Sequence, residues 1–234
     1  MATIVLVHGA WAGGWVWARM TPHLRAAGHD VYTPTLTGSG ERSHLLTREV
    51  DLNTHVDDIA NVIKFENLDD VILVGHSYSG MVITEIASKM PERIAHLVYV
   101  DAFVPEAGVG LLENSTSRSA METSAREQGD GWRIPSLPID YLGISEPEDV
   151  EWTEPRMSDH PLKSFLQAVD TGSLDSETIE RTYIRATDGN TSLTETVKRI
   201  KAQGGWSYRE IPTGHQAMVT MPKQLAVMLN EIAE

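Results

Sequence analysis

The segment Gly75-His76-Ser77-Tyr78-Ser79-Gly80 contains the residue types that present a nucleophilic serine. A serine hydroxyl is a poor nucleophile unless a base takes its proton and its oxygen is openly presented. A tight turn from a strand into a helix presents it, provided that small residues stand two positions before and after the serine. Gly75 fills the first place, and Ser79, which is small but is not glycine, fills the second. Because an apolar run at residues 71–74 precedes the turn and a helical pattern follows it, we predict that Ser77 is a nucleophile.

The general base is predicted to be His215. This residue follows the last predicted strand and precedes the final helix, where a loop at the carboxyl edge of a parallel sheet would carry it toward Ser77. An imidazole with an ordinary pKa of about 6.5 can accept and return a proton near neutral pH. The chain has nine histidines. Of the other eight, two lie in turns beside the site, four are predicted surface residues, and His44 and His160 could line a pocket.

Two aspartates compete to orient the imidazole. Asp188 follows the predicted strand at residues 182–185, and Asp101 follows the predicted strand at residues 97–100. We favour Asp188 because the order serine, acid, histidine is expected of such triads. Its alternative role is that of a turn aspartate before glycine, and Asp101 then remains as the rival acid.

Two main-chain N–H groups are expected to hold the oxyanion of the reaction. One belongs to Tyr78, directly after the nucleophile, and the other to Ala10, in the glycine-rich turn that follows the first predicted strand. No cofactor is expected, because the fragment Gly38-Ser39-Gly40 lacks the remainder of a nucleotide-binding motif. No metal is expected either, since no metal-ligand spacing occurs.

Short apolar strands alternate with helices over most of the chain. Strands are predicted at residues 4–7, 31–33, 71–74, 97–100, 182–185 and 208–211, with helices after residues 21, 54, 81 and 222. Thr21 is expected to cap the first helix, and Thr54 with Asp57 has the spacing of a capping box for the second. This alternation predicts an α/β fold with a mostly parallel sheet and helices on both faces.

The alternation fades between residues 106 and 181, which we interpret as a small helical lid inserted into the core. Residues 1–105 and 182–234 would form that core. Aromatic and apolar side chains of the insertion could form the ceiling of a substrate pocket, although packing of the lid against the core explains them equally well. The pocket residues expected from the lid and from the site turns are Trp11, His76, Trp132, Tyr141, Trp152, Met157 and Gln216.

Composition excludes several classes of protein. The formal net charge of −14 disfavours a nucleic-acid partner and, more mildly, membrane surfaces and anionic substrates. The chain has no cysteine, so disulfides and thiolate nucleophiles are excluded. No targeting segment and no bilayer-spanning apolar run is found, which favours a soluble cytoplasmic protein that acts on a small molecule.

The sequence resembles the methylesterase and hydroxynitrile-lyase group of the α/β-hydrolases. The resemblance rests on the motifs around the first turn, at Leu24–His29 and before Ser77, and the motifs at residues 40–44 and 101–105 are similar to those of bacterial esterase members. It is dense over residues 1–105 and 182–234 and thin across the insertion. It implies the triad of Ser77, Asp188 and His215, the oxyanion donors Ala10 and Tyr78, a lid over an apolar pocket, and no cofactor.

The resemblance also bears on the reaction. Lyase members carry threonine where Gly9 stands and lysine where Gln216 stands, so an esterase for small to medium hydrophobic or aromatic esters, working through an acyl-enzyme, is favoured. The alternative is a cofactor-independent lyase or oxygenase on the same scaffold, since a fold does not fix a function. Members of the group are often dimers, which leaves a homodimer open for this chain.

Overall fold

A six-stranded parallel sheet forms the centre of the protein in the computed structural model, which describes residues 1–113, 115–171, 179–188 and 192–234. The strand order is β2-β1-β3-β4-β7-β8, and every neighbouring pair is parallel. The predicted parallel α/β fold and its six strands are therefore confirmed. The strands are β1 (Thr3–Val7), β2 (Asp30–Tyr32), β3 (Val71–His76), β4 (Ile94–Val100), β7 (Glu180–Ala186) and β8 (Ser207–Ile211).

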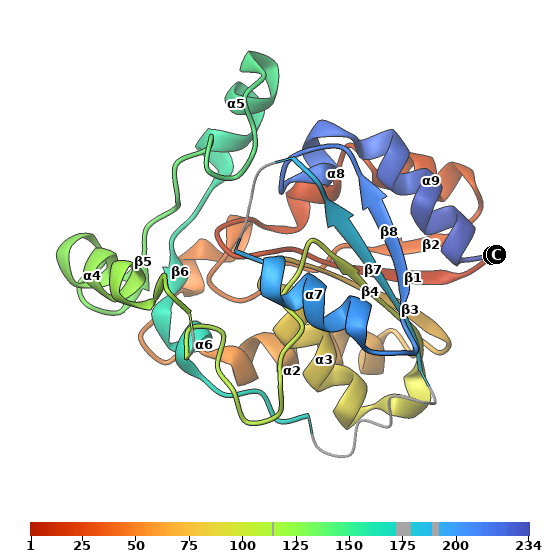
Figure 1. The fold of residues 1–234 in the computed structure, drawn as a ribbon, viewed down its shortest axis with the longest axis horizontal. Coiled ribbons are helices and arrows are strands. Elements are labelled where there is room, and N and C mark those ends of the chain that lie inside the picture. Colours follow the sequence, from red (N-terminus) through yellow and green to blue (C-terminus); the bar gives the residue numbers. More distant parts are fainter. Residues whose placement is uncertain (114, 172–178, 189–191) are drawn as a thin grey trace.

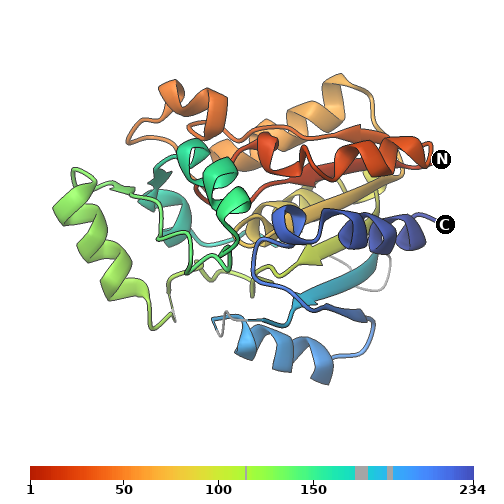
Figure 2. The ribbon, with the colours of Figure 1, turned by 90° about the horizontal axis from the view of Figure 1, so that it is seen from above.

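Helices cover both faces of the sheet. Successive side chains of a strand point to opposite faces, and both sets are apolar here, so each face needs helices to bury it. Val5 and Val7 of β1 belong to the core shared with α2 and α3, whereas Ile4 and Leu6 belong to the core shared with α1 and α9. Figure 1 shows α2 and α3 on one side of the sheet, and Figure 2 shows α1 and α9 side by side on the other. The helices of this core are α1 (Thr21–Ala26), α2 (Leu52–Phe65), α3 (Ser79–Lys89), α7 (Thr194–Ala202), α8 (Ala217–Thr220) and α9 (Pro222–Ile232).

Two predicted helix starts need correction. The α2 helix begins at Leu52, with Asp51 as its N-cap, and the capping box joins Asp51 to Thr54 rather than Thr54 to Asp57. Thr54 therefore stands at the third position of the helix, where its hydroxyl accepts a hydrogen bond from the main-chain N–H of Asp51. The α1 helix already includes Thr21, and its N-cap, Met20, provides no side-chain hydrogen bond.

The described helices and strands between β4 and β7 lie beyond the carboxyl ends of the sheet strands and include a small antiparallel pair, β5 with β6 (Figure 1). Two hydrogen bonds join this segment to the turn after β1. The indole Nε1 of Trp11 donates to Ile134 O at 3.0 Å, and Ser158 N donates to Trp11 O at 2.8 Å. β7 starts at Glu180, so residues 180 and 181, predicted to end the insertion, belong to the sheet. The elements of this segment are α4 (Arg118–Gln128), β5 (Arg133–Ile134), α5 (Pro147–Thr153), η4 (Glu154–Arg156), β6 (His160–Pro161) and α6 (Leu162–Leu166).

Three further short 3-10 turns complete the described structure: η1 (Gly14–Trp17), η2 (Gly40–Leu45) and η3 (Pro91–Arg93). Among the described residues, no helix has both the length and the apolar character required to cross a lipid bilayer.

Candidate active site

Ser77 occupies a strained turn between β3 and α3. Its φ of 54° lies in the left-handed region, which a non-glycine residue adopts only at a cost in energy. Gly75 makes the turn possible, because a Cβ at this position would lie 2.8 Å from Ser79 O. Ser79 is fully buried, and its hydroxyl donates a hydrogen bond to the main-chain carbonyl of His8. The serine that replaces the expected glycine is thus accommodated by a hydrogen bond to the turn after β1.

His215 and Asp101 are hydrogen-bonded in the interior of the protein. The Nδ1 of His215 lies 2.6 Å from Oδ2 of Asp101, and the two side chains are 6% and 1% exposed. A carboxylate can only accept, so Nδ1 carries the proton and Nε2 keeps a free lone pair. Arg185 and the N–H of Ala186 donate to Asp101 Oδ1 at 2.5 and 3.2 Å, which satisfies the other carboxylate oxygen. The imidazole is therefore held in the tautomer that a general base requires.

The aspartate expected to contact His215 was Asp188, and the structure corrects this choice to the rival, Asp101. Asp188 is exposed, its main-chain N–H donates to Thr213 O at 2.9 Å, and its carboxylate accepts from the Thr187 hydroxyl at 3.0 Å. It is a turn residue two positions beyond the end of β7, whereas Asp101 directly follows β4. Both residues satisfy the order serine, acid, histidine, so chain order could not separate them.

Arg185 is a residue of this site that the sequence reasoning missed. Its side chain is 13% exposed on β7 and pairs with Asp101 across the boundary between two neighbouring strands. A buried arginine requires a counterion. The available signal was a charge at the end of the predicted strand at residues 182–185, after three uncharged residues that are buried in the structure. The aspartate that meets this charge directly follows the neighbouring parallel strand, β4.

The main-chain N–H groups of Ala10 and Tyr78 border the same space as Ser77. Ala10 follows β1, and Tyr78 stands at the N-terminus of α3, where the helix dipole favours negative charge. Within the part of the chain that the structure describes, neither N–H donates to a protein carbonyl. Trp11, which follows Ala10, has a φ of 63°, so this turn also contains a left-handed residue.

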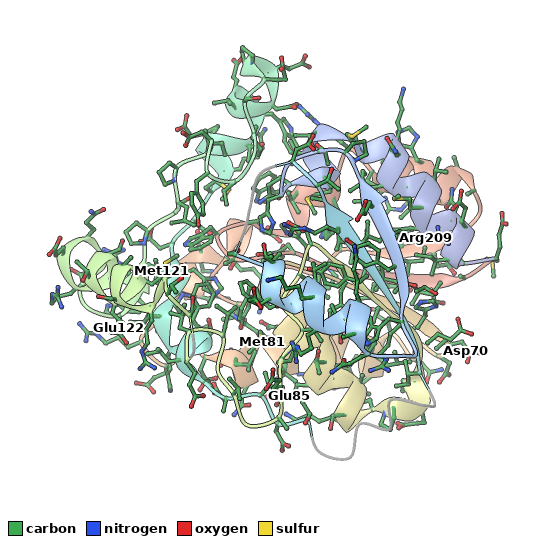
Figure 3. All side chains as sticks on the ribbon, in the orientation of Figure 1. Asp70, Met81, Glu85, Met121, Glu122 and Arg209 are labelled. Carbon is green, nitrogen blue, oxygen red and sulfur yellow. The ribbon has the colours of Figure 1, made fainter. Side chains whose placement is uncertain are left out.

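A cavity of about 470 Å³ opens over Ser77 and His215. Its wall combines apolar and polar side chains. Met81 of α3 and Met121 of α4 line it from the core and from the β4–β7 segment respectively (Figure 3). The described residues include no hydrogen bond between Ser77 and His215, and in unliganded enzymes such bonds are often long until substrate binds. Other apolar lining residues are Phe103, Val104, Leu111, Leu112, Leu142 and Phe165.

Of the seven pocket residues expected from sequence, the cavity is lined by Trp11 and Tyr141. His76 is buried beneath the site and does not line the cavity. Trp132 and Trp152 do not line it either, and arginine side chains lie over their indole rings. Met157 packs against the hydrophobic core, and Gln216 is 2% exposed, with an Oε1 that has no hydrogen-bond partner among the described residues. These five expectations are wrong as to lining. Residues such as Phe103, which follow β4 within the motif at residues 101–105, were the better candidates.

Several buried histidines surround the site in their neutral form. Burial lowers the pKa of His8 and of His55 to about 4, and it lowers that of His76 well below the ordinary value, with the neighbouring His215 adding to the effect. The Nε2 of His76 lies 2.9 Å from the main-chain O of His215 and therefore donates to it. These rings act as neutral hydrogen-bonding groups that hold the site loops. Among the described residues, no three His, Asp or Glu side chains are grouped as metal ligands.

The sequence matches the model of the alpha/beta hydrolase family over residues 4–227, and the chain belongs to this family. Within it, the chain falls in the methylesterase-like group of carboxylic ester hydrolases. It is 39% identical to a carbendazim hydrolyzing esterase of Nocardioides sp., over 98% of each chain, and 28% identical to salicylic acid-binding protein 2 of Nicotiana tabacum, over 98% of this chain and 96% of the relative. An extracellular alpha/beta-hydrolase from a Paenibacillus species has the same fold, with a TM-score of 0.86, 24% identity, and coverage of 99% and 98% of the two chains.

Proposed function

We propose that the protein is a serine esterase that cleaves small to medium hydrophobic or aromatic carboxylic esters through an acyl-enzyme. Ser77 attacks the ester carbonyl while His215 takes its proton, and Asp101 holds the imidazole and stabilises its protonated form. The N–H groups of Ala10 and Tyr78 stabilise the oxyanion. The alcohol leaves with the proton from His215, and water then releases the acid from Ser77.

The observation that carries this proposal is the pairing of His215 with Asp101 beside Ser77. The 2.6 Å bond to Asp101 leaves Nε2 of the imidazole as the free acceptor, and both Ser77 and His215 border one cavity. A proton-accepting nitrogen and a strained, presented hydroxyl at a common cavity are the parts that acyl transfer requires. The esterases among the relatives support the same reaction class.

The substrate class follows from the cavity wall. A volume of about 470 Å³ suits a molecule with one aromatic ring or a medium acyl chain, and Trp11, Met81 and Phe103 give its wall an apolar part. We further propose that the segment between β4 and β7 acts as the lid of this cavity, since α4 contributes Met121 and α6 contributes Phe165 to the lining.

Hydrolysis of p-nitrophenyl esters of increasing acyl length tests the proposal. Ser77→Ala is expected to lower kcat by about a million-fold, because nucleophile and base act as one unit. Ser115→Ala is the matched control, since this second serine also lines the cavity and its removal should leave kcat within a few-fold of native. Native turnover by Ser77→Ala would refute the mechanism.

An organophosphonate separates the esterase from the alternative lyase or oxygenase. A serine nucleophile should be phosphonylated at Ser77, as detected by a mass increase on the peptide that contains it. In the alternative, the serine only orients the substrate, so cyanide release or oxygen consumption would occur without trapping. The surroundings of Gly9 favour the esterase, because a Cβ there would lie 3.0 Å from Ser77 Cβ and a threonine would need the turn to shift.

A further inference from the structure

The ring of His8 is fully buried and bonds to the main chain on both sides. Leu36 N lies 3.0 Å from its Nε2, and its Nδ1 lies 2.8 Å from Gly9 O. A peptide N–H can only donate, so Nε2 is the acceptor and the ring proton sits on Nδ1. Nδ1 therefore donates to the carbonyl of Gly9. The proposed reaction makes no use of this histidine, and its ring is not part of the cavity wall.

The carbonyl that His8 holds belongs to the same peptide group as the N–H of Ala10. The described part of the chain contains no cis peptide bond, and in a trans peptide the C=O and the N–H point in opposite directions. Fixing the Gly9 carbonyl toward the His8 ring therefore fixes the Ala10 N–H on the opposite side. Gly9 cannot contribute through a side chain, since a Cβ there would lie 2.8 Å from the His76 ring.

A second bond ties His8 to the other oxyanion donor. The Ser79 hydroxyl donates to the main-chain carbonyl of His8, and Ser79 directly follows Tyr78 at the start of α3. His8 thus bonds through its ring to the peptide of one donor and through its carbonyl to the neighbour of the other. Two donors aim at one developing charge only if their separation is fixed, and both bonds constrain that separation.

We propose that His8 is a positioning residue, which holds the Ala10 N–H in register with the Tyr78 N–H to receive the oxyanion. The inference rests on the proposed serine-esterase function. A neutral ring suits this role, and the ring stays neutral at pH 7 because burial lowers its pKa to about 4. Leu36 N–H would lose its acceptor if Nε2 became protonated.

Two amide substitutions separate the two ring bonds. In His8→Asn the side-chain Nδ2 takes the place of the ring Nδ1, so the donor to Gly9 O is kept and the acceptor for Leu36 N–H is lost. In His8→Gln the longer amide reaches the place of Nε2, so the Leu36 acceptor is kept and the donor to Gly9 O is lost. Each variant leaves one main-chain group unpaired, which makes their stability costs comparable.

The experiment compares the native protein, both variants and Ser77→Ala by kcat, KM and melting temperature on a p-nitrophenyl ester. We expect His8→Gln to lower kcat by about 10- to 100-fold with little change in KM, since a full oxyanion donor contributes about 100- to 1,000-fold. His8→Asn should stay within about 3-fold of the native kcat. A trifluoromethyl ketone, whose adduct with the serine mimics the oxyanion, should bind more weakly to His8→Gln by a similar factor.

Equal kcat for His8→Gln and the native protein would overturn the inference, as would equal losses in the two variants that follow their melting temperatures. Native protein without Ser77-dependent hydrolysis would overturn the proposed function, and the role of His8 would fall with it. An active native enzyme whose kcat is indifferent to the His8→Gln change would overturn the role of His8 alone.

Discussion

Replacing Asp101 by asparagine should reverse the tautomer of His215. The Oδ1 of Asp101 accepts from Arg185 and from the N–H of Ala186, at 2.5 and 3.2 Å, while Oδ2 faces His215. An asparagine must turn its carbonyl oxygen to these two donors, because its NH₂ group cannot accept from them. The NH₂ group then faces Nδ1 of His215 and forces the ring proton onto Nε2, where it blocks acceptance of the Ser77 proton.

The expected cost of Asp101→Asn is about 10,000-fold in kcat, which corresponds to about 5 kcal/mol of transition-state stabilisation. Asp188→Asn is the matched control and should keep kcat within about 2-fold, since Asp188 is exposed and its carboxylate accepts from the hydroxyl of the adjacent Thr187. The assay is steady-state hydrolysis of a p-nitrophenyl ester, with the melting temperature of each variant measured alongside. Loss of kcat in Asp188→Asn together with retention in Asp101→Asn would refute the reasoning.

Three further perturbations have defined outcomes. His8 and His55 are neutral when folded, with pKa values lowered by burial to about 4, so the unfolded chain binds more protons as pH falls from 6.5 to 4. The free energy of unfolding should then decrease by about 3 kcal/mol per ring at pH 4, as urea titration would measure. Gly75→Ala should lower kcat at least 100-fold, because its Cβ would lie 2.8 Å from Ser79 O. Tyr183→Phe should cost about 1–3 kcal/mol in urea unfolding, because the buried hydroxyl donates to a main-chain carbonyl at 2.9 Å.

Each of these outcomes has a control. The pH effect should shrink in His55→Gln relative to the native protein, and an unchanged slope of stability with pH would contradict the assignment of neutral rings. Gly204→Ala tests whether a glycine substitution alone reduces kcat, since a Cβ at that position meets nothing within 4 Å and its backbone lies outside the left-handed region. Tyr141→Phe is the control for Tyr183→Phe, because Tyr141 is 55% exposed and loss of its hydroxyl should leave the free energy of unfolding unchanged.

Local pattern was sufficient to predict the sheet and the tight turn at Ser77. An apolar strand, a small-residue turn and a helical pattern lie within about 20 consecutive residues around Ser77, so periodicity and sterics act over short distances. The same reasoning selected His215 as the candidate general base, because the loop that carries it is short and lies between the last strand and the helices that follow. The strand ends were predicted a few residues short, since edge residues such as Thr3 and Glu180 are polar and lack the apolar signal.

The acid and the cavity wall depended on contacts between distant parts of the chain. Asp101 and Asp188 have the same order relative to Ser77 and His215, and only the pairing of β4 with β7 shows which one meets a buried arginine. The path of the described segment between β4 and β7 depends on long-range hydrogen bonds such as that from the Trp11 indole to Ile134 O. No local sequence pattern predicts such bonds. Aromatic residues there could not be divided into cavity wall and outer surface for this reason.

The left-handed backbone conformation at the site lowers the stability of the fold at residues that the proposed reaction needs. Six non-glycine residues in the described chain have a positive φ, and four of them are Asn or Asp, which tolerate it. The exceptions are Trp11, in the turn after β1, and Ser77, directly after β3. Both line the cavity of the proposed reaction, and such a conformation costs about 1–3 kcal/mol at each residue. Glycine at either position would relieve the backbone strain and raise the melting temperature, but it would remove a side chain that lines the cavity. Substitutions intended to raise thermal stability are therefore better placed at exposed helix positions than at these two turns.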